Sequence, residues 1–240
     1  MMLETILDAL FPDGHDVRLD GKTITGEAAT PLGTVAVLGT ADAAAMDHAI
    51  ALGLSAFILE TVARHPGRPF VYLVDTSGQA LSRSEELLCL NGSLAHLAEC
   101  VDLARRRGHP SLSLVTANAV SGGFLSYGLM ADRVFALKDV QVRVMDLRAM
   151  SRVTRIEHEK LVELAGHSPI FAPGAENYLR MGAIEAVWDE PSASRLVDAL
   201  TSLQRGVAAG DHRMKLGCGR GGRMLAEPVA LSVQAAGGGV

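Results

Sequence analysis

Two glycine-containing turns carry the residues of this chain that are best suited to chemistry. The first is NAVSGG at residues 118–123, and the second is VDTSGQ, which ends at Gln79. Each follows an apolar run that is typical of a buried strand. Backbone N–H groups at a helix start lack intrahelical acceptors, and glycine lets a substrate oxygen approach them without meeting a Cβ. We therefore predict an oxyanion hole with Gly122 and Gly123 as donors and with Gly78 and Gln79 as the facing turn.

The same residues allow other interpretations. Gly122 and Gly123 would also be needed if a helix packed closely against the sheet with no ligand involved. Ser121 suggests a hydrolase, because the turn resembles the nucleophile turn of ClpP-type serine proteases. A serine nucleophile needs a histidine base within reach, however, and no histidine occurs between Ser121 and His158. We expect Ser121 to cap the short helix and, with Asn118, to belong to the substrate-binding residues.

Charged residues supply the remaining candidates. Arg143 and Arg148 follow a predicted strand, and their guanidinium groups are suited to binding a carboxylate or a phosphate. Ordinary surface or subunit-interface arginines are the alternative. Asp75 ends a buried strand, where forming the turn is favoured over acting as a general base. His158 lies among glutamates in a predicted helix, and this pattern is typical of a solvated charged face.

Composition excludes several classes of protein. The 240 residues are 48% hydrophobic and 20% charged, which fits one globular domain with a sizeable core. The net charge of -5 gives no general support for a nucleic-acid partner. No apolar run approaches the roughly 20 residues of a membrane span, and the first residues lack a signal-peptide pattern, so we expect a cytoplasmic protein with no membrane partner. The three cysteines contain no CxxC pair, so neither a disulfide framework nor a metal site is predicted.

Alternating strands and helices predict the α/β class. Residues 16–40 contain β-branched residues and turn signals that predict a small antiparallel region. The apolar runs at 70–76, 111–116 and 132–138 are expected to be strands of a mostly parallel sheet. Helical patterns between them predict right-handed crossover connections.

The helices and the end of the chain complete the organisation. Thr40 is the predicted cap of a long helix, and Ser82 with Glu85 forms a capping box at the start of another that continues to the triple arginine. We expect one domain at residues 1–210 and a flexible tail, rich in glycine and arginine, at 211–240. Docking of an acidic protein or of a phosphate-rich group is the alternative role for the tail.

The chain resembles the crotonase-type carboxyltransferases, in which a VDTPG-like strand turn precedes an SGG turn followed by ADRV. Within that superfamily it is most similar to the gamma subunits of biotin-independent malonate decarboxylases. The similarity covers most of residues 35–190 and includes RHPGRPFVYLVDTSGQ, LARRRGHP, SGGFLSYGLMAD, VRVMDLRAMSRVT and SPIFAPGAENYLRMGAIEAVW.

The resemblance implies a ClpP/crotonase-like fold of repeated ββα units, of the carboxyltransferase C-half type. It implies a carboxy-lyase in which this gamma subunit and a beta subunit of similar fold form the site that converts malonyl-S-acyl carrier protein to acetyl-S-acyl carrier protein and CO2. No cofactor would be bound directly, because a phosphopantetheine-type prosthetic group of the carrier protein holds the substrate. A separate acyl-carrier transferase subunit would regenerate the malonyl thioester.

Two alternatives stay open. The chain would be a carboxyltransferase subunit of a biotin-dependent acyl-CoA carboxylase, although its DTSGQ turn in place of a DTPG-type turn and its short length speak against this. It would otherwise be a non-catalytic subunit that supports a catalytic beta partner.

Overall fold

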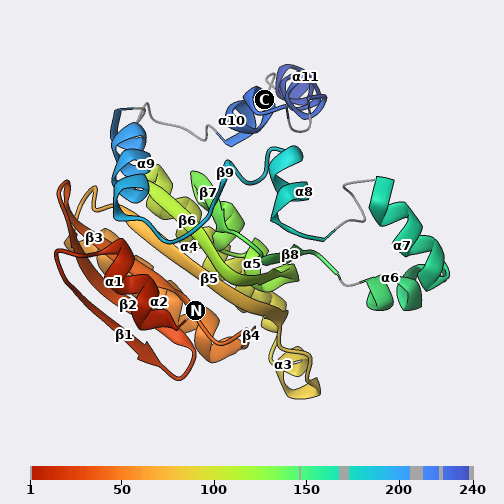
Figure 1. Ribbon diagram of the computed structural model, residues 1–240, viewed down its shortest axis with the longest axis horizontal. Coiled ribbons are helices and arrows are strands. Elements are labelled where there is room, and N and C mark those ends of the chain that lie inside the picture. The colour runs from red at the N-terminus through yellow and green to blue at the C-terminus, as the bar shows by residue number, and fades with distance from the viewer. Residues whose placement is uncertain (1, 146, 168–172, 206–212, 222–223, 238–240) are drawn as a thin grey trace.

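The chain is described by a computed structural model over residues 2–145, 147–167, 173–205, 213–221 and 224–237. Its strands form one sheet in the order β1-β2-β3-β5-β6-β7-β9, with β4 paired to β5 and β8 paired to β6 (Figure 1). The strands are β1 (His15–Asp20), β2 (Thr23–Thr30), β3 (Gly33–Thr40), β4 (Ala44–Met46), β5 (Phe70–Gln79), β6 (Ser111–Val120), β7 (Arg133–Leu137), β8 (Gln141–Arg143) and β9 (Ala186–Trp188).

The sheet changes direction after its first three strands. β1, β2 and β3 pair antiparallel, which confirms the antiparallel region predicted at 16–40, and every pairing from β3 onward is parallel. β4 and β8 extend the sheet only at the carboxyl ends of β5 and β6. The two central strands therefore end in a small four-stranded arrangement, β4-β5-β6-β8, that holds both glycine turns.

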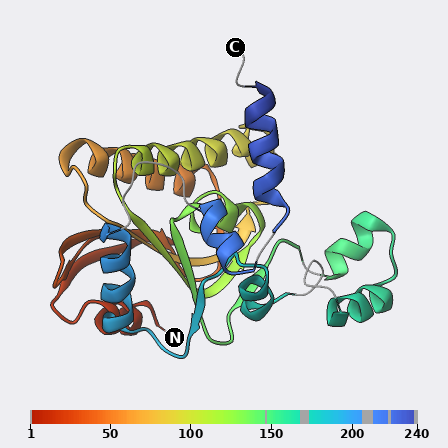
Figure 2. The same cartoon turned by 90° about the horizontal axis from the view of Figure 1, so that it is seen from above.

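Helices cover both faces of the sheet and explain why its central strands are apolar. α2 and α4 lie side by side over one face, whereas α1 and α9 lie on the other side (Figure 2). Phe70 to Val74 and Leu112, Leu114 and Val115 are consequently buried. The helices are α1 (Leu3–Leu10), α2 (His48–Arg64), α3 (Arg83–Leu87), α4 (Leu90–Arg106), α5 (Ser121–Leu125), the 3-10 helix η1 (Gly128–Met130), α6 (Leu147–Thr154), α7 (His158–His167), α8 (Ala175–Arg180), α9 (Ala193–Arg205), α10 (Arg213–Gly219) and α11 (Ala226–Gly237).

The long helix α2 begins later than the sequence predicts. Thr40 is not its cap, because Thr40 ends β3 and its hydroxyl is hydrogen-bonded to the hydroxyl of Tyr127. Ala44–Met46 then pairs with the end of β5, so the helix cannot start before this strand is complete. Asp47 is the cap, and its side chain accepts a hydrogen bond of 2.8 Å from the Ile50 amide.

The helix predicted after Ser82 is divided in two. Ser82 caps α3 and accepts a hydrogen bond from the Glu85 amide, as predicted. Cys89 has a φ of 59° in the left-handed region, which ends that helical run and lets α4 start in a new direction. No glycine or proline stands at this position to indicate the break.

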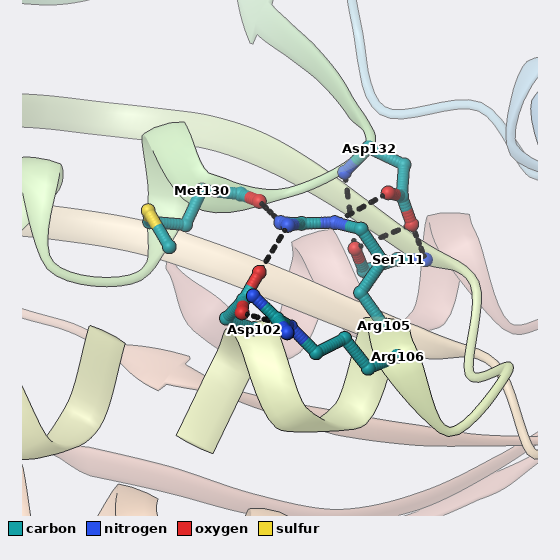
Figure 3. A network of polar contacts seen from close by, with 6 residues as sticks. All are labelled: Asp102, Arg105, Arg106, Ser111, Met130 and Asp132. Atoms are coloured by element: carbon teal, nitrogen blue, oxygen red, sulfur yellow. Dashed lines mark hydrogen bonds and ion pairs between the residues drawn. The ribbon is translucent and has the colours of Figure 1, made fainter. Parts of the chain in front are cut away.

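A polar network fixes the start of β6 (Figure 3). Asp132 accepts hydrogen bonds of 2.8 Å from the Ser111 amide, 2.9 Å from the Ser111 hydroxyl and 2.9 Å from Arg105 Nε. Arg105, whose side chain is 7% exposed, also donates to Asp102 and to the Met130 carbonyl. The network joins the end of α4 to β6 and β7, so the aspartate of the ADRV motif has a structural role.

The last part of the chain contains more helix than the sequence predicts. In the described part of the predicted tail at 211–240, α10 and α11 are both helical. Arg220 follows α10 and lies with its Nη1 4.0 Å from Glu185 Oε2. The boundary at residue 210 lies outside the described residues, and the mobility of the tail stays a prediction. Among the described helices, none has both the length and the apolar character that crossing a membrane would require.

Candidate active site at the ends of two parallel strands

The structure brings the two predicted glycine turns together. β5 and β6 run parallel, and their register shifts before Thr76 pairs with Ala119. Gly78 has a φ of +105°, and a Cβ built on it would lie 3.4 Å from Ser121 Cβ and 3.5 Å from the Val120 carbonyl oxygen. Because the turns are in contact, their backbone groups face one small region at the carboxyl edge of the sheet.

Two amides of this region already have acceptors within the chain. The Gly122 amide donates to Gln79 Oε1 over 3.2 Å, and the Gly78 amide donates to Thr76 Oγ1 over 3.1 Å. Thr76 is buried and itself donates to the Ala44 carbonyl over 2.7 Å, which holds it in place. Gln79 is only half-buried. The Gly122 amide is therefore the one of these two donors whose acceptor can rotate away for a ligand.

Gly122 and Gly123 differ in what surrounds them. A Cβ on Gly123 would lie 2.4 Å from Thr76 Oγ1 and 2.9 Å from Met46 Cγ, so glycine is required for α5 to pack on β4 and β5. A Cβ on Gly122 would lie 3.1 Å from Gln79 Oε1, at the far end of a flexible side chain. Among the described residues, the Gly123 amide has no hydrogen-bond partner outside α5.

Ser121 does not cap α5, contrary to the prediction. It is the first residue of the helix, with a φ of 49°, and the preceding Val120 provides no side-chain oxygen for a cap. Within the described part of the chain, no histidine is hydrogen-bonded to the Ser121 hydroxyl, so the base that a serine nucleophile would need is missing from its surroundings. His167 is the last residue of α7, and residues 168–172 lie outside the description.

Asp75 organises the turn as the sequence predicts. Its Oδ1 accepts hydrogen bonds from the Asn118 amide over 3.1 Å and from Asn118 Nδ2 over 3.0 Å. Its Oδ2 accepts one of 2.9 Å from the amide of Ala43, whose φ of 47° is left-handed. The Asn118 side chain, a candidate for substrate binding, is thus bonded to the carboxylate that shapes the turn.

The two candidate arginines lie in different surroundings. Arg143 is in β8, directly paired with Val120 beside the glycine turn, and is partly buried. Arg148 is exposed on α6, which packs mainly on α7 and stands off the sheet in both views (Figures 1 and 2). The structure therefore places Arg143 next to the turn and Arg148 on a separate helical pair. No group of three His, Cys, Asp or Glu residues in the described ranges is arranged to hold a metal ion.

Comparison with known proteins places this site in a family. The family model described as malonate decarboxylase gamma subunit matches residues 41–237, which include both glycine turns. The chain belongs to that family. The resemblance inferred from the sequence is thereby confirmed, and the match continues through α10 to the end of α11, beyond the range in which the sequence motifs are strongest.

Two carboxyltransferases are among the curated relatives of this chain. It is 32% identical over 170 residues to the malonyl-S-ACP:biotin-protein carboxyltransferase of Malonomonas rubra, covering 66% of the chain and 58% of the relative. It is 30% identical over 143 residues to the acetyl-coenzyme A carboxylase carboxyl transferase subunits beta/alpha of Saccharopolyspora erythraea, covering 60% of the chain and 24% of the relative. The chain thus spans little more than half of the first relative and a quarter of the second.

Solved structures confirm the fold of the gamma-subunit chain. A chain of a Pseudomonas malonate decarboxylase hetero-tetramer in complex with coenzyme A superposes with a TM-score of 0.82 at 24% identity, over 96% of this chain and 97% of that one. A transcarboxylase 12S chain superposes with a TM-score of 0.69 at 16% identity, over 84% of this chain and 40% of that one. The predicted α/β class and crotonase-like carboxyltransferase fold are therefore confirmed.

A buried tyrosine behind the glycine turn was not predicted from the sequence. The Tyr127 hydroxyl shares a hydrogen bond of 2.8 Å with Thr40 Oγ1 and donates to the Leu73 carbonyl over 3.3 Å. Burial raises the pKa of Tyr127, so the phenol keeps its proton and remains a donor. In the sequence, Tyr127 is one polar hydroxyl within the apolar stretch FLSYGLM. The hydrophobic periodicity of that stretch does not distinguish it from its neighbours.

Polar contacts around His48 anchor the segment that follows Gln79. His48 Nδ1 lies 2.7 Å from Ser93 Oγ, and its Nε2 lies 3.1 Å from the Glu85 carbonyl oxygen. The His48 amide also donates to Glu85 Oε2 over 3.0 Å. These contacts attach α3 to the starts of α2 and α4. In the same segment the apolar side chains of Leu81, Leu87 and Leu88 are exposed, as is that of Leu125 in α5.

Proposed function

We propose that this chain, together with a beta subunit of similar fold, forms the site at which malonyl-S-acyl carrier protein loses CO2 to give acetyl-S-acyl carrier protein. The family match over residues 41–237 carries this proposal. The Malonomonas relative, which acts on malonyl-S-ACP, supports the choice of substrate. We expect the complex to be cytoplasmic.

The proposed chemistry requires donors and no nucleophile. Loss of CO2 from a malonyl thioester leaves an enolate, whose oxygen is stabilised by preorganised N–H groups. We assign the amides of Gly122 and Gly123 to a substrate oxygen, with Gly78 and Gln79 as the opposite wall. The absence of a base beside Ser121 within the described residues agrees with a reaction that forms no acyl-serine.

The remaining candidates would hold the substrate. Arg143 lies beside the turn, where its guanidinium group can pair with the malonyl carboxylate. Asn118 would act through the turn, because Asp75 holds its side chain. Ser121 would contact the substrate through its hydroxyl at the edge of the glycine turn. Arg148 would bind the substrate from α6.

The partner subunit is proposed from the exposed apolar side chains in the segment that follows Gln79. Leu81 and Leu87 are 86% and 73% exposed, and such side chains are typical of surfaces that a permanent partner covers. A Pseudomonas malonate decarboxylase has been solved as an MdcD-MdcE hetero-dimer, and one of its chains superposes on this chain with a TM-score of 0.76. The prosthetic group of the carrier and the transferase that reloads it are part of the same proposal.

A carboxyltransferase is the second candidate function, because the Malonomonas relative transfers the carboxyl group of malonyl-S-ACP to a biotin protein. One assay separates the two. The complex purified with its beta subunit is incubated with malonyl-S-carrier, and CO2 release is measured with and without avidin. We expect equal release in both. If the carboxyl group instead appears on an added biotin protein, and avidin abolishes this transfer, the carboxyltransferase replaces the decarboxylase.

A further inference from the structure

Three exposed arginines lie in α6 and directly after it. Arg148 and Arg152 are four residues apart, which places them on one side of the helix, and Arg155 follows the last helical residue with a left-handed φ of 63°. All three are exposed. Within the described part of the chain, none of them has an ion-pair or hydrogen-bond partner, whereas Arg18, Arg64, Arg105, Arg106 and Arg133 each pair with a carboxylate. We call these three residues the arginine face.

Helix α6 is positively charged, although the protein as a whole is negative. The protein has a net charge of -5, yet α6 itself contains no aspartate or glutamate. The nearest described acidic residues, Glu157 and Glu159, are exposed and belong to the next turn and helix. Val153, 71% exposed, adds an apolar side chain between the arginines. Such a surface attracts an acidic partner and gains from steering it at long range.

The arginine face is close to the candidate active site along the chain. Arg143 pairs with Val120 at the glycine turn, and Leu147, the first residue of α6, comes four positions after Arg143. A chain of four residues spans at most about 14 Å. α6 and α7 stand off the sheet, so a second protein can reach them without displacing the core (Figures 1 and 2).

We propose that the arginine face of α6 docks an acidic surface of the acyl carrier protein, so that its prosthetic arm enters along β8 toward Gly122. This inference rests on the proposed function. A permanent subunit interface is expected to be mainly apolar, as beside Leu81 and Leu87, whereas a carrier that must dock and leave is suited to charged contacts. Arg220 of the tail is a weaker choice, because it already lies near Glu185.

The test is carrier binding to the assembled complex. The substituted chain carries Arg152→Glu and Arg155→Glu, and the matched control carries Arg18→Glu and Arg64→Glu, which change the charge equally at two other exposed arginines, on β1 and α2. Binding of malonyl-S-carrier is measured by interferometry at low and high salt. We expect affinity to fall about tenfold in the α6 variant at low salt, to be unchanged in the control, and to differ less at high salt.

A kinetic arm uses malonyl-pantetheine, which presents the same thioester without the protein. We expect the α6 variant to show a raised KM for malonyl-S-carrier and an unchanged kcat/KM for malonyl-pantetheine. Equal carrier affinity in the variant and the wild type would overturn the proposal, as would loss of the beta subunit on size exclusion, which would assign the face to the subunit interface. If the wild-type complex binds the carrier through α6 but releases no CO2, the proposed function fails and the docking surface stands.

Discussion

The side-chain oxygen of Gln79 lies 3.2 Å from the backbone nitrogen of Gly122 and accepts its hydrogen bond. The two residues belong to different turns and are 43 residues apart in the chain. The amide that we assign to a substrate oxygen is therefore occupied by a neutral amide oxygen of the protein. Substrate binding must break this contact, so the strength of the internal acceptor should affect activity.

Replacing Gln79 tests that relationship in both directions. Gln79→Glu puts a carboxylate on the Gly122 amide, a hydrogen bond about 1 kcal/mol stronger than the neutral one, and it also repels the malonyl carboxylate. We expect its kcat/KM to fall roughly tenfold or more, whereas Gln79→Ala should lower KM. Steady-state CO2 release by the complex measures both. Identical kinetics in the glutamate variant and the wild type would show that Gly122 does not meet the substrate.

The two glycines of the turn should differ in stability effects. A methyl group on Gly123 meets Thr76 Oγ1 at 2.4 Å, so Gly123→Ala should lower the free energy of unfolding by about 1–3 kcal/mol. Gly122→Ala is the matched control, because its only tight contact among the three nearest atoms is 3.1 Å to the movable end of Gln79, and Leu94 Cδ1 lies at an ordinary 3.6 Å. Urea denaturation compares them. Equal losses in the two variants would refute the packing difference.

Removal of Asp132 should destabilise the fold from outside the site. Asp132→Ala leaves Arg105, 7% exposed, without one of its two carboxylates and leaves the Ser111 amide without its acceptor. We expect a loss of about 3 kcal/mol in the free energy of unfolding. Asp102→Ala is the control, and it should cost only about 1 kcal/mol because Asp102 is more exposed. The reverse order of the two losses would contradict the role given to Asp132.

Tyr127 should make stability depend on alkaline pH. Burial raises its pKa above the ordinary value of 10.0, so above pH 10 the unfolded chain loses a proton that the folded chain retains. This contribution is complete below pH 10 and is lost as pH rises. Tyr127→Phe should cost about 1–3 kcal/mol at neutral pH, because Thr40 and the Leu73 carbonyl lose a partner.

The free energy of unfolding of the wild type and of Tyr127→Phe is measured by urea denaturation at pH 7 and at about pH 10.5. The phenylalanine variant should lose less stability between the two pH values than the wild type does. An equal loss in both proteins would mean that another buried group causes the alkaline dependence.

Strands and turns that depend on local composition were predictable. The apolar runs at 70–76 and 111–116 predicted the two central strands because both of their faces are covered. The two glycine turns were expected side by side because each follows the carboxyl end of a strand in a parallel sheet. Asp75 was also placed correctly as a turn former. In each of these cases a short local pattern carried the prediction.

Features that depend on distant partners were not predictable. The start of α2 moved from Thr40 to Asp47 because β4 pairs with a strand about thirty residues later. The left-handed residue at Cys89 has no glycine to mark it. Gly122 and Gly123 look equivalent in the sequence, and only the packing of Thr76 and Gln79 distinguishes them.

The most direct test of the account is the initial rate of CO2 release from malonyl-S-carrier by the beta subunit alone and by the beta subunit with this chain. We predict that release requires both chains and that Gln79→Glu lowers the rate without dissociating them. If the beta subunit alone releases CO2 at the full rate, this chain contributes no part of the site, and the proposed function is wrong.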